Sequence, residues 1–151
     1  RVLLPLPRLL CLHVRQPQVL PSVEQHVLVL RLVVLDESGG AIEITSSWLE
    51  GEHEAKEGNA TLEEMAVWAY TDLSDIDSAD MLIQFTEHPS TRGGAHTEFG
   101  YALARDIDDM QLVVCGPVGN IFHAHETVVH HPDWASTRSW LLGFVAGRSA
   151  A

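Results

Sequence analysis

One glutamate stands out as a residue whose position suits it to chemistry. Glu98 follows an apolar segment, residues 81–86, and a double glycine, Gly93 and Gly94, and it opens a stretch with helical character. In a parallel α/β sheet, the carboxyl ends of strands and the amino ends of the following helices border the ligand crevice. The pattern therefore predicts Glu98 in the first turn of a helix, pointing at a bound ligand. There the helix dipole favours an ionised carboxylate, as a nucleophile requires.

Polar residues on both sides of Glu98 are candidates for holding the ligand. Ser90 and Arg92 could bind a hydroxyl or a 5′-phosphate, and the two glycines could expose backbone amides to a sugar. Tyr101 lies three residues after Glu98 on the same helix face, so it could hydrogen-bond that carboxylate. The plainer alternatives are a flexible surface loop and a core tyrosine.

Four histidines within nine residues raise the question of a metal site. Their spacing matches no metal-ligand signature, and no cysteine lies near them. We therefore predict exposed or structural histidines, no bound metal and no cofactor; the four are His123, His125, His130 and His131.

Strand-like and helix-like segments alternate along the chain, which predicts an α/β protein. Thr61 and Glu64 form a capping box that marks one helix start, and Met65, Trp68 and Leu73 form its expected core stripe. We predict a flavodoxin- or Rossmann-like parallel sheet of four to five strands flanked by helices, with right-handed crossovers. The predicted strands are 9–14, 41–47, 81–86, 111–115 and 127–130, and the predicted helices are 23–37, 61–78, 95–105 and 134–145.

Composition bounds the class of protein. A chain of 151 residues with 46% hydrophobic content fits one domain, residues 1–151. Its formal charge of −12 argues against nucleic acid and anionic membranes as partners, but a small nucleoside or nucleotide remains compatible. Cys11 and Cys115 lack CxxC spacing and suggest reduced core thiols of a cytoplasmic protein. Residues 1–14 fit neither a signal peptide nor a membrane span, and form an atypical first strand with an uncertain start.

Three blocks of sequence together resemble the nucleoside 2-deoxyribosyltransferase family, in particular its short phage- and actinobacterial-type members. They are residues 47–51, residues 72–100, and residues 114–123 together with 131–134. Residues 92–104, which read RGGAHTEFGYALA, carry most of the likeness. The resemblance implies an enzyme that cleaves or transfers at the N-glycosidic bond of (deoxy)nucleosides, with Glu98 as the nucleophile. The first strand departs from the family pattern, which puts substrate contacts from that strand in doubt.

The resemblance also implies roles for two residues outside the glycine segment. Asp72 matches an aspartate on the preceding helix that could hold the base or assist Glu98 in proton handling, because protonation eases departure of the base. Asn120 lies in a loop that approaches the substrate, in some members from a neighbouring subunit, so a homo-oligomer is expected; an ordinary turn asparagine is the alternative. A nucleoside transferase, a nucleoside 5′-monophosphate hydrolase and a non-catalytic nucleotide-binding or sensing module all remain open.

Overall fold

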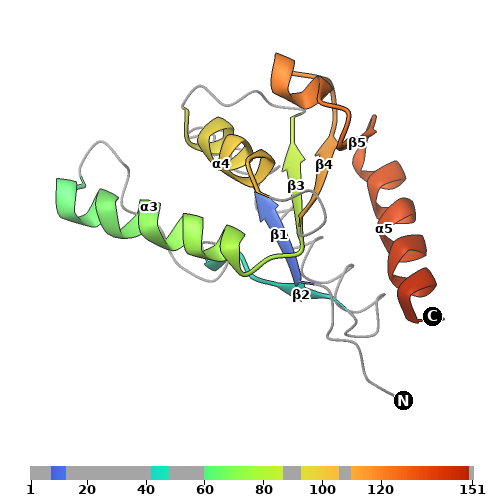
Figure 1. The fold of residues 1–151 in the computed structure, drawn as a ribbon, viewed down its shortest axis with the longest axis horizontal. Helices are drawn as coiled ribbons and strands as arrows, with labels where there is room; N and C mark the ends of the chain where they lie inside the picture. The colour runs from blue at the N-terminus through green and yellow to red at the C-terminus, as the bar shows by residue number, and fades with distance from the viewer. Residues whose placement is uncertain (1–7, 13–41, 48–59, 87–92, 106–109, 150–151) are drawn as a thin grey trace.

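The computed structural model describes residues 8–12, 42–47, 60–86, 93–105 and 110–149. Within these ranges one parallel sheet has the strand order β2-β1-β3-β4-β5, so the predicted α/β fold is confirmed (Figure 1). The strands are β1 (Arg8–Leu12), β2 (Glu43–Ile44), β3 (Met81–Phe85), β4 (Gln111–Cys115) and β5 (Val128–His131). The helices are α3 (Leu62–Asp77), α4 (Gly94–Leu103), the short 3₁₀ helix η4 (Ile121–Ala124) and α5 (Trp134–Ser149).

Helices cover both faces of the sheet. Leu141 and Val145 of α5 pack against one face, and Ile76 of α3 and Phe99 of α4 pack against the other (Figure 1). The central strands β3 and β4 are buried on both faces, which explains why both are almost wholly apolar in sequence. Thus the two core layers hold α4 and α5 on opposite sides of the same strands.

Local sequence signals set the bounds of α3 as predicted. The Thr61 hydroxyl accepts from the backbone N–H of Glu64 at 3.2 Å, and the Glu64 carboxylate accepts from the backbone N–H of Thr61 at 2.7 Å. This reciprocal capping box satisfies two amide donors that the first helical turn leaves without partners. At the other end, Arg105 donates from Nη1 to the carbonyl oxygen of Ile76 at 2.6 Å and so ties the end of α3 to α4.

Three expectations about the elements need correction. The predicted second strand, 41–47, pairs only at Glu43–Ile44 among the described residues, and the last helix continues to Ser149. Met65 is 36% exposed and does not join a core stripe, because the amino-terminal part of α3 reaches beyond the sheet (Figure 1). Ile76, near the other end of the helix, is the residue that is fully buried. The helix predicted at 23–37 lies outside the described residues.

The strand order fixes where a ligand would bind. The chain passes from β1 to β2 on one side, and β3 then pairs with β1 on the other side. The carboxyl ends of β1 and β3 therefore form the topological switch point of the sheet, which is the usual ligand crevice of such folds. None of the helices in the described part of the chain has the length and hydropathy to cross a membrane.

Candidate functional site

Backbone and side-chain hydrogen bonds fix the carboxyl edge of β3 and β4. Thr86, directly after β3, donates its backbone N–H to the carbonyl oxygen of Cys115 at 2.9 Å and its hydroxyl to that of Pro117 at 2.7 Å. Gly116 adopts a φ of 119°, a conformation that favours glycine, and its N–H bonds to the carbonyl oxygen of His131. The loop after β4 is therefore anchored to both neighbouring strands.

Glu98 lies in the second turn of α4, so its predicted first-turn position is wrong. Gly93 is the N-cap and the helix begins at Gly94, and the first turn holds no acidic residue. Because the effect of the helix dipole falls off within the first turn, the dipole favours ionised Glu98 less than expected. The Glu98 side chain is half-buried, and its Oε1 is 4.0 Å from the position that a Cβ on Gly94 would take.

The double glycine provides space next to this carboxylate. Neither Gly93 nor Gly94 has a positive φ, so the backbone conformation does not require glycine at either position. Among the described residues, an ideal Cβ on Gly93 would meet no atom within 4 Å, and one on Gly94 would meet only Glu98. Within the described part of the chain, the two glycines thus leave space on the amino-terminal side of Glu98.

One side of α4, which we call the α3 flank, carries Tyr101, which contacts helix α3. Glu98 precedes Tyr101 by three residues and so lies on the same side of α4. The Tyr101 hydroxyl donates to Oδ1 of Asp77 on α3 at 2.9 Å. A phenol has one proton to donate, so Tyr101 donates it to Asp77 and not to Glu98, the partner that the sequence had left open. The bond to Asp77 raises the pKa of Tyr101, since a phenolate would lose it and would be repelled by the carboxylate. Asp72 is half-buried on α3, the helix that packs against α4.

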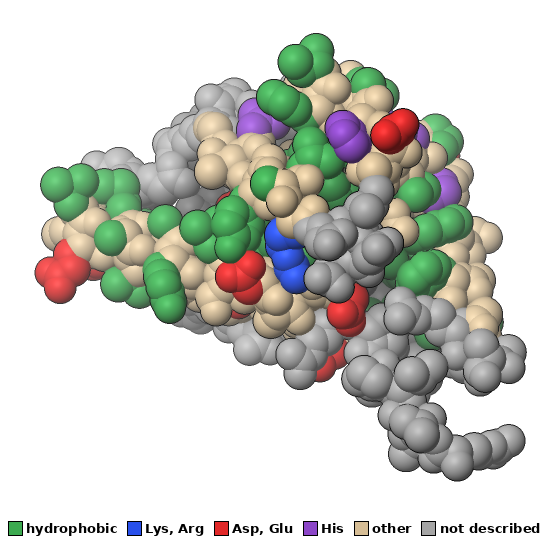
Figure 2. All heavy atoms as spheres, viewed as in Figure 1, with side chains coloured by type: hydrophobic (Ala, Val, Ile, Leu, Met, Phe, Trp, Pro, Cys, Tyr) green, Lys and Arg blue, Asp and Glu red, His purple; other side chains and the backbone are tan. Residues whose placement is uncertain are grey.

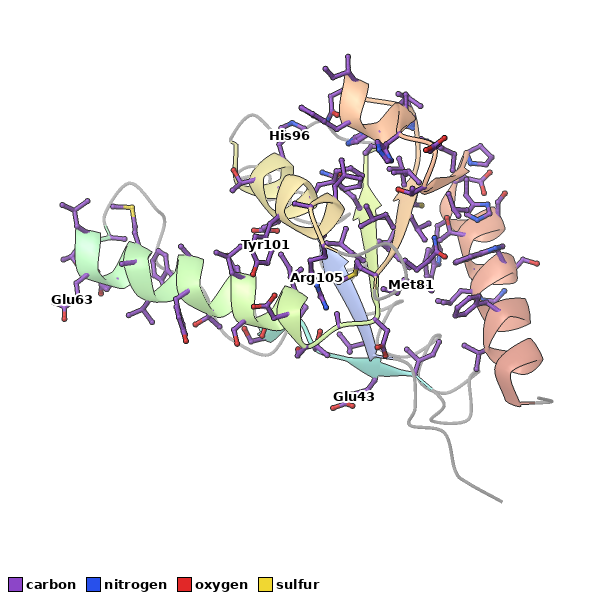
Figure 3. The ribbon with its side chains drawn as sticks, viewed as in Figure 1. Glu43, Glu63, Met81, His96, Tyr101 and Arg105 are labelled. Atoms are coloured by element: carbon purple, nitrogen blue, oxygen red, sulfur yellow. The ribbon has the colours of Figure 1, made fainter. Side chains whose placement is uncertain are left out.

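The opposite side of α4, the η4 flank, carries His96. Residues two positions apart on a helix are separated by roughly 200° around its axis, so His96 projects away from the side of Glu98. Figure 3 shows His96 and Tyr101 on opposite sides of α4. Nδ1 of His96 lies 3.2 Å from Nδ2 of Asn120, the residue that caps η4.

Both polar atoms of the Asn120 side chain face groups of the same chain on this flank. Its Oδ1 accepts from the backbone N–H groups of Phe122 at 2.8 Å and His123 at 3.3 Å, and these two bonds fix the orientation of its amide. Its Nδ2 faces ring nitrogens of His96 and, at 3.0 Å, His123. Within one chain, therefore, the structure places Asn120 on the other side of α4 from Glu98.

His123 is a buried structural histidine. It is 0% exposed, and its ring meets Phe99 edge-on at a centroid distance of 4.9 Å. Both of its ring nitrogens face donors, the backbone N–H of Gly119 at 3.1 Å and Nδ2 of Asn120. A neutral imidazole can accept from one of them and an imidazolium from neither. Burial, followed by the neighbouring His96 and His130, lowers the pKa of His123.

The remaining predicted site residues are not placed by the structure. Ser90 and Arg92 lie outside the described residues, so a phosphate-binding role for them stays a prediction. In the ranges that the structure describes, no three His, Cys, Asp or Glu side chains are grouped so that they could hold a metal ion.

Three other polar residues were not predicted as notable from the sequence. The Asp75 carboxylate accepts from the backbone N–H of Ser47 at 2.7 Å and so ties α3 to the segment after β2. The hydroxyl of Ser46 and Oε1 of Gln84 are buried without a hydrogen-bond partner among the described residues. A polar residue in an apolar strand, such as Gln84 in residues 81–85, was the available clue.

A solved structure with the same architecture is the CMP N-glycosidase BcmB of Clostridium botulinum. It is 16% identical to this chain, with a TM-score of 0.51, and the match covers 89% of this chain and 97% of that one. The two proteins share a fold. No protein-family model and no curated protein sequence matches the chain. At this identity the likeness concerns the Rossmann-like arrangement of strands and helices, and the chemistry has to be argued from the residues.

Proposed function

We propose that this protein cleaves or transfers at the N-glycosidic bond of a nucleoside or nucleotide, with Glu98 as the nucleophile. The observation that carries the proposal is the half-buried Glu98 carboxylate on the α3 flank, beside the open space at Gly93 and Gly94. It stands on the helix that follows β3, at the switch point of the sheet. The family resemblance of residues 92–104 and the fold shared with a CMP N-glycosidase support the same class of reaction.

The chemistry suits a carboxylate. Breaking an N-glycosidic bond passes through an oxocarbenium-like state, which a carboxylate under the anomeric carbon stabilises or captures as a glycosyl ester. Glu98 forms the new bond to the anomeric carbon while the electron pair of the C–N bond leaves with the base. Asp72 assists by holding the base or by handling the proton that eases its departure.

The fate of the glycosyl ester decides between the two reaction types. A second nucleobase that attacks the ester gives a new nucleoside and makes the enzyme a transferase, whereas water gives the free sugar and makes it a hydrolase. If Ser90 and Arg92 hold a 5′-phosphate, the substrate is a nucleoside 5′-monophosphate, the substrate class named for the C. botulinum enzyme.

One incubation separates these outcomes. Purified protein is mixed with deoxycytidine or CMP, with and without free adenine, and the products are resolved by chromatography. A new nucleoside identifies a transferase, and free base with sugar or sugar phosphate identifies a hydrolase. Saturable binding without turnover contradicts the catalytic proposal and identifies a binding or sensing module.

We also propose that the protein acts as a homo-oligomer in which the Asn120 loop of one subunit reaches the site of its neighbour. Asn120 lies away from Glu98 within one chain, and exposed apolar side chains surround it: Val118 is 59% exposed, Ile121 81% and Phe122 57%. Figure 2 shows hydrophobic side chains gathered over η4. An apolar group of this kind is typical of a protein contact surface.

Subunit mixing tests the shared site. In a two-fold dimer, mixing Glu98→Gln with Asn120→Ala should restore about a quarter of wild-type activity, because half of the dimers are mixed and each mixed dimer has one intact site. Light scattering gives the assembly state in parallel. A strict monomer with full activity would exclude a shared site.

A further inference from the structure

Gln84 is a buried polar side chain inside an otherwise apolar strand. It is 2% exposed, lies one residue before the end of β3 and pairs in register with Leu12, the last residue of β1. Its Nε2 donates to the carbonyl oxygen of Ala95, in the first turn of α4, at 3.4 Å. Because that carbonyl can only accept, the amide group must face Ala95 with its nitrogen, and Oε1 must face elsewhere.

That oxygen has no hydrogen-bond partner among the described residues. Buried amide oxygens are nearly always hydrogen-bonded, because an unpaired one loses its hydration and gains nothing in return. Packing alone does not explain a glutamine here, since a methionine or leucine of similar size would fill the space without this cost. The unpaired acceptor therefore points to a donor that lies outside the described residues.

The position of Gln84 suggests where the donor comes from. The residue lies on β3 at its carboxyl end, next to β1 across the switch point and under the first turn of the helix that carries Glu98. We propose that Gln84 is a specificity residue whose Oε1 accepts a hydrogen bond from an N–H or O–H group of the bound nucleoside or nucleotide. This assignment rests on the proposed function. A site with a buried acceptor discriminates strongly, because an analogue without the donor leaves the acceptor unpaired.

Two pairs of substrates distinguish the possible sources of the donor. CMP and UMP differ at the base, where CMP carries its donor on the 4-amino group and UMP carries its donor at N3, beside a 4-carbonyl oxygen. CMP and dCMP differ at the sugar, where dCMP lacks the 2′-hydroxyl donor. We expect the wild-type protein to prefer one member of one pair by about tenfold or more in kcat/KM, namely the member whose donor reaches Oε1 of Gln84, and Gln84→Met to lose that preference.

Gln111→Met is the matched control. Gln111 is also a strand glutamine, but it begins β4 at the opposite edge of the sheet, and its amide donates to the carbonyl oxygen of Leu112. This variant should keep the wild-type preferences. Gln84→Met should unfold at the same temperature as the wild type or at a higher one, because the unpaired oxygen is gone. Gln84→Leu serves the same purpose if the methionine variant does not fold.

The outcomes separate the two proposals. A wild-type protein that turns over these nucleotides without a preference in either pair, or a Gln84 variant that keeps the preference, overturns the role of Gln84 and leaves the proposed function standing. Equal losses for all substrates together with lower stability would identify a structural glutamine and also overturn the role. A wild-type protein that neither binds nor cleaves any of the nucleotides overturns the proposed function. That result also overturns the role of Gln84, which rests on the proposed function.

Discussion

The two flanks of α4 differ in how their polar side chains are used. On the η4 flank, both the oxygen and the nitrogen of the Asn120 amide face groups of their own chain, and His123 is buried between two donors. On the α3 flank, the Glu98 carboxylate is half-buried and borders open space at the double glycine. Within the described residues, one side of α4 is therefore held by polar contacts with the loop after β4, and the other side has space beside Glu98.

The comparison of the two flanks shows that a cluster of titratable side chains does not by itself indicate a catalytic site. The histidine-rich segment, residues 123–131, is the more conspicuous feature of the sequence. Its histidines nevertheless make contacts that hold the loop after β4 in place. His130 contacts the carbonyl oxygen of His123 through its ring, and His125 contacts the hydroxyl of Thr127. Glu98 on the other flank is the better candidate for a nucleophile, because the described residues leave space beside it at Gly93 and Gly94.

The largest difference in glycosidic turnover is expected between the variants Glu98→Gln and His96→Gln. Both residues lie on α4, two positions apart, and both substitutions keep a polar side chain of similar size. Glu98→Gln should lower glycosidic turnover on the order of a thousandfold or more, as expected for loss of a covalent nucleophile. His96→Gln should leave turnover within a few-fold of the wild type, measured by release of free base. Near wild-type turnover of folded Glu98→Gln would show that Glu98 is not the nucleophile.

A smaller effect on turnover is expected from filling the space beside Glu98. Gly94→Ala places a methyl group about 4.0 Å from Oε1 of Glu98, and we expect it to lower kcat/KM by roughly tenfold to a hundredfold through displacement of the substrate. Gly100→Ala is the control, since a Cβ there meets nothing within 4 Å and the residue is exposed. That variant should keep activity and gain about 0.5–1 kcal/mol in free energy of unfolding. Equal activity of the two variants would mean that the space at Gly94 is not used.

The sequence predicted strands β3, β4 and β5 and the helix that carries Glu98, because those features are encoded locally. Runs such as 81–85 and 111–115 are apolar on both faces of a buried strand, and the Thr61 capping box is a short-range signal. The turn of α4 that holds Glu98 could not be fixed in the same way. Glycine is compatible with either a turn or a helix, so whether Gly93 and Gly94 precede or begin α4 depends on its packing against the sheet.

Contacts between segments far apart in the chain also could not be predicted from the sequence. Tyr101 and Glu98 share a helix face, which suggested a bond between them, but the approach of α3 offers Asp77 instead. His96 and Asn120 are 24 positions apart and meet only because α4 and the loop after β4 lie at the same edge of the sheet. Pairings of this kind follow from the tertiary arrangement and leave no periodic or spacing signal.

Replacing the Asn120 side chain tests whether its polar contacts on the η4 flank stabilise the protein. Asn120→Ala removes the cap of η4 and its contacts with two histidines, so we expect it to lower the free energy of unfolding by about 1 kcal/mol. Denaturant titration measures this directly. Asn120→Asp should recover part of the loss, because its carboxylate can still accept from the N–H groups of Phe122 and His123. An alanine variant as stable as the wild type would mean that the network does not hold the loop.

The smallest effect is expected from the pH dependence of stability that His123 contributes. Burial lowers the pKa of His123 in the folded protein, while the unfolded chain takes up its proton near the ordinary value of 6.5. The unfolded state therefore binds more protons just below pH 6.5, so the contribution of this residue is complete above that pH and is lost as the pH falls towards the lowered folded pKa. Thermal or denaturant unfolding, measured between pH 8 and pH 5, should show this decline in the free energy of unfolding as the pH falls. His123→Leu should flatten it, whereas His125→Gln, on the exposed side of the same loop, should leave it unchanged; identical pH profiles of all three proteins would exclude His123 as the group responsible.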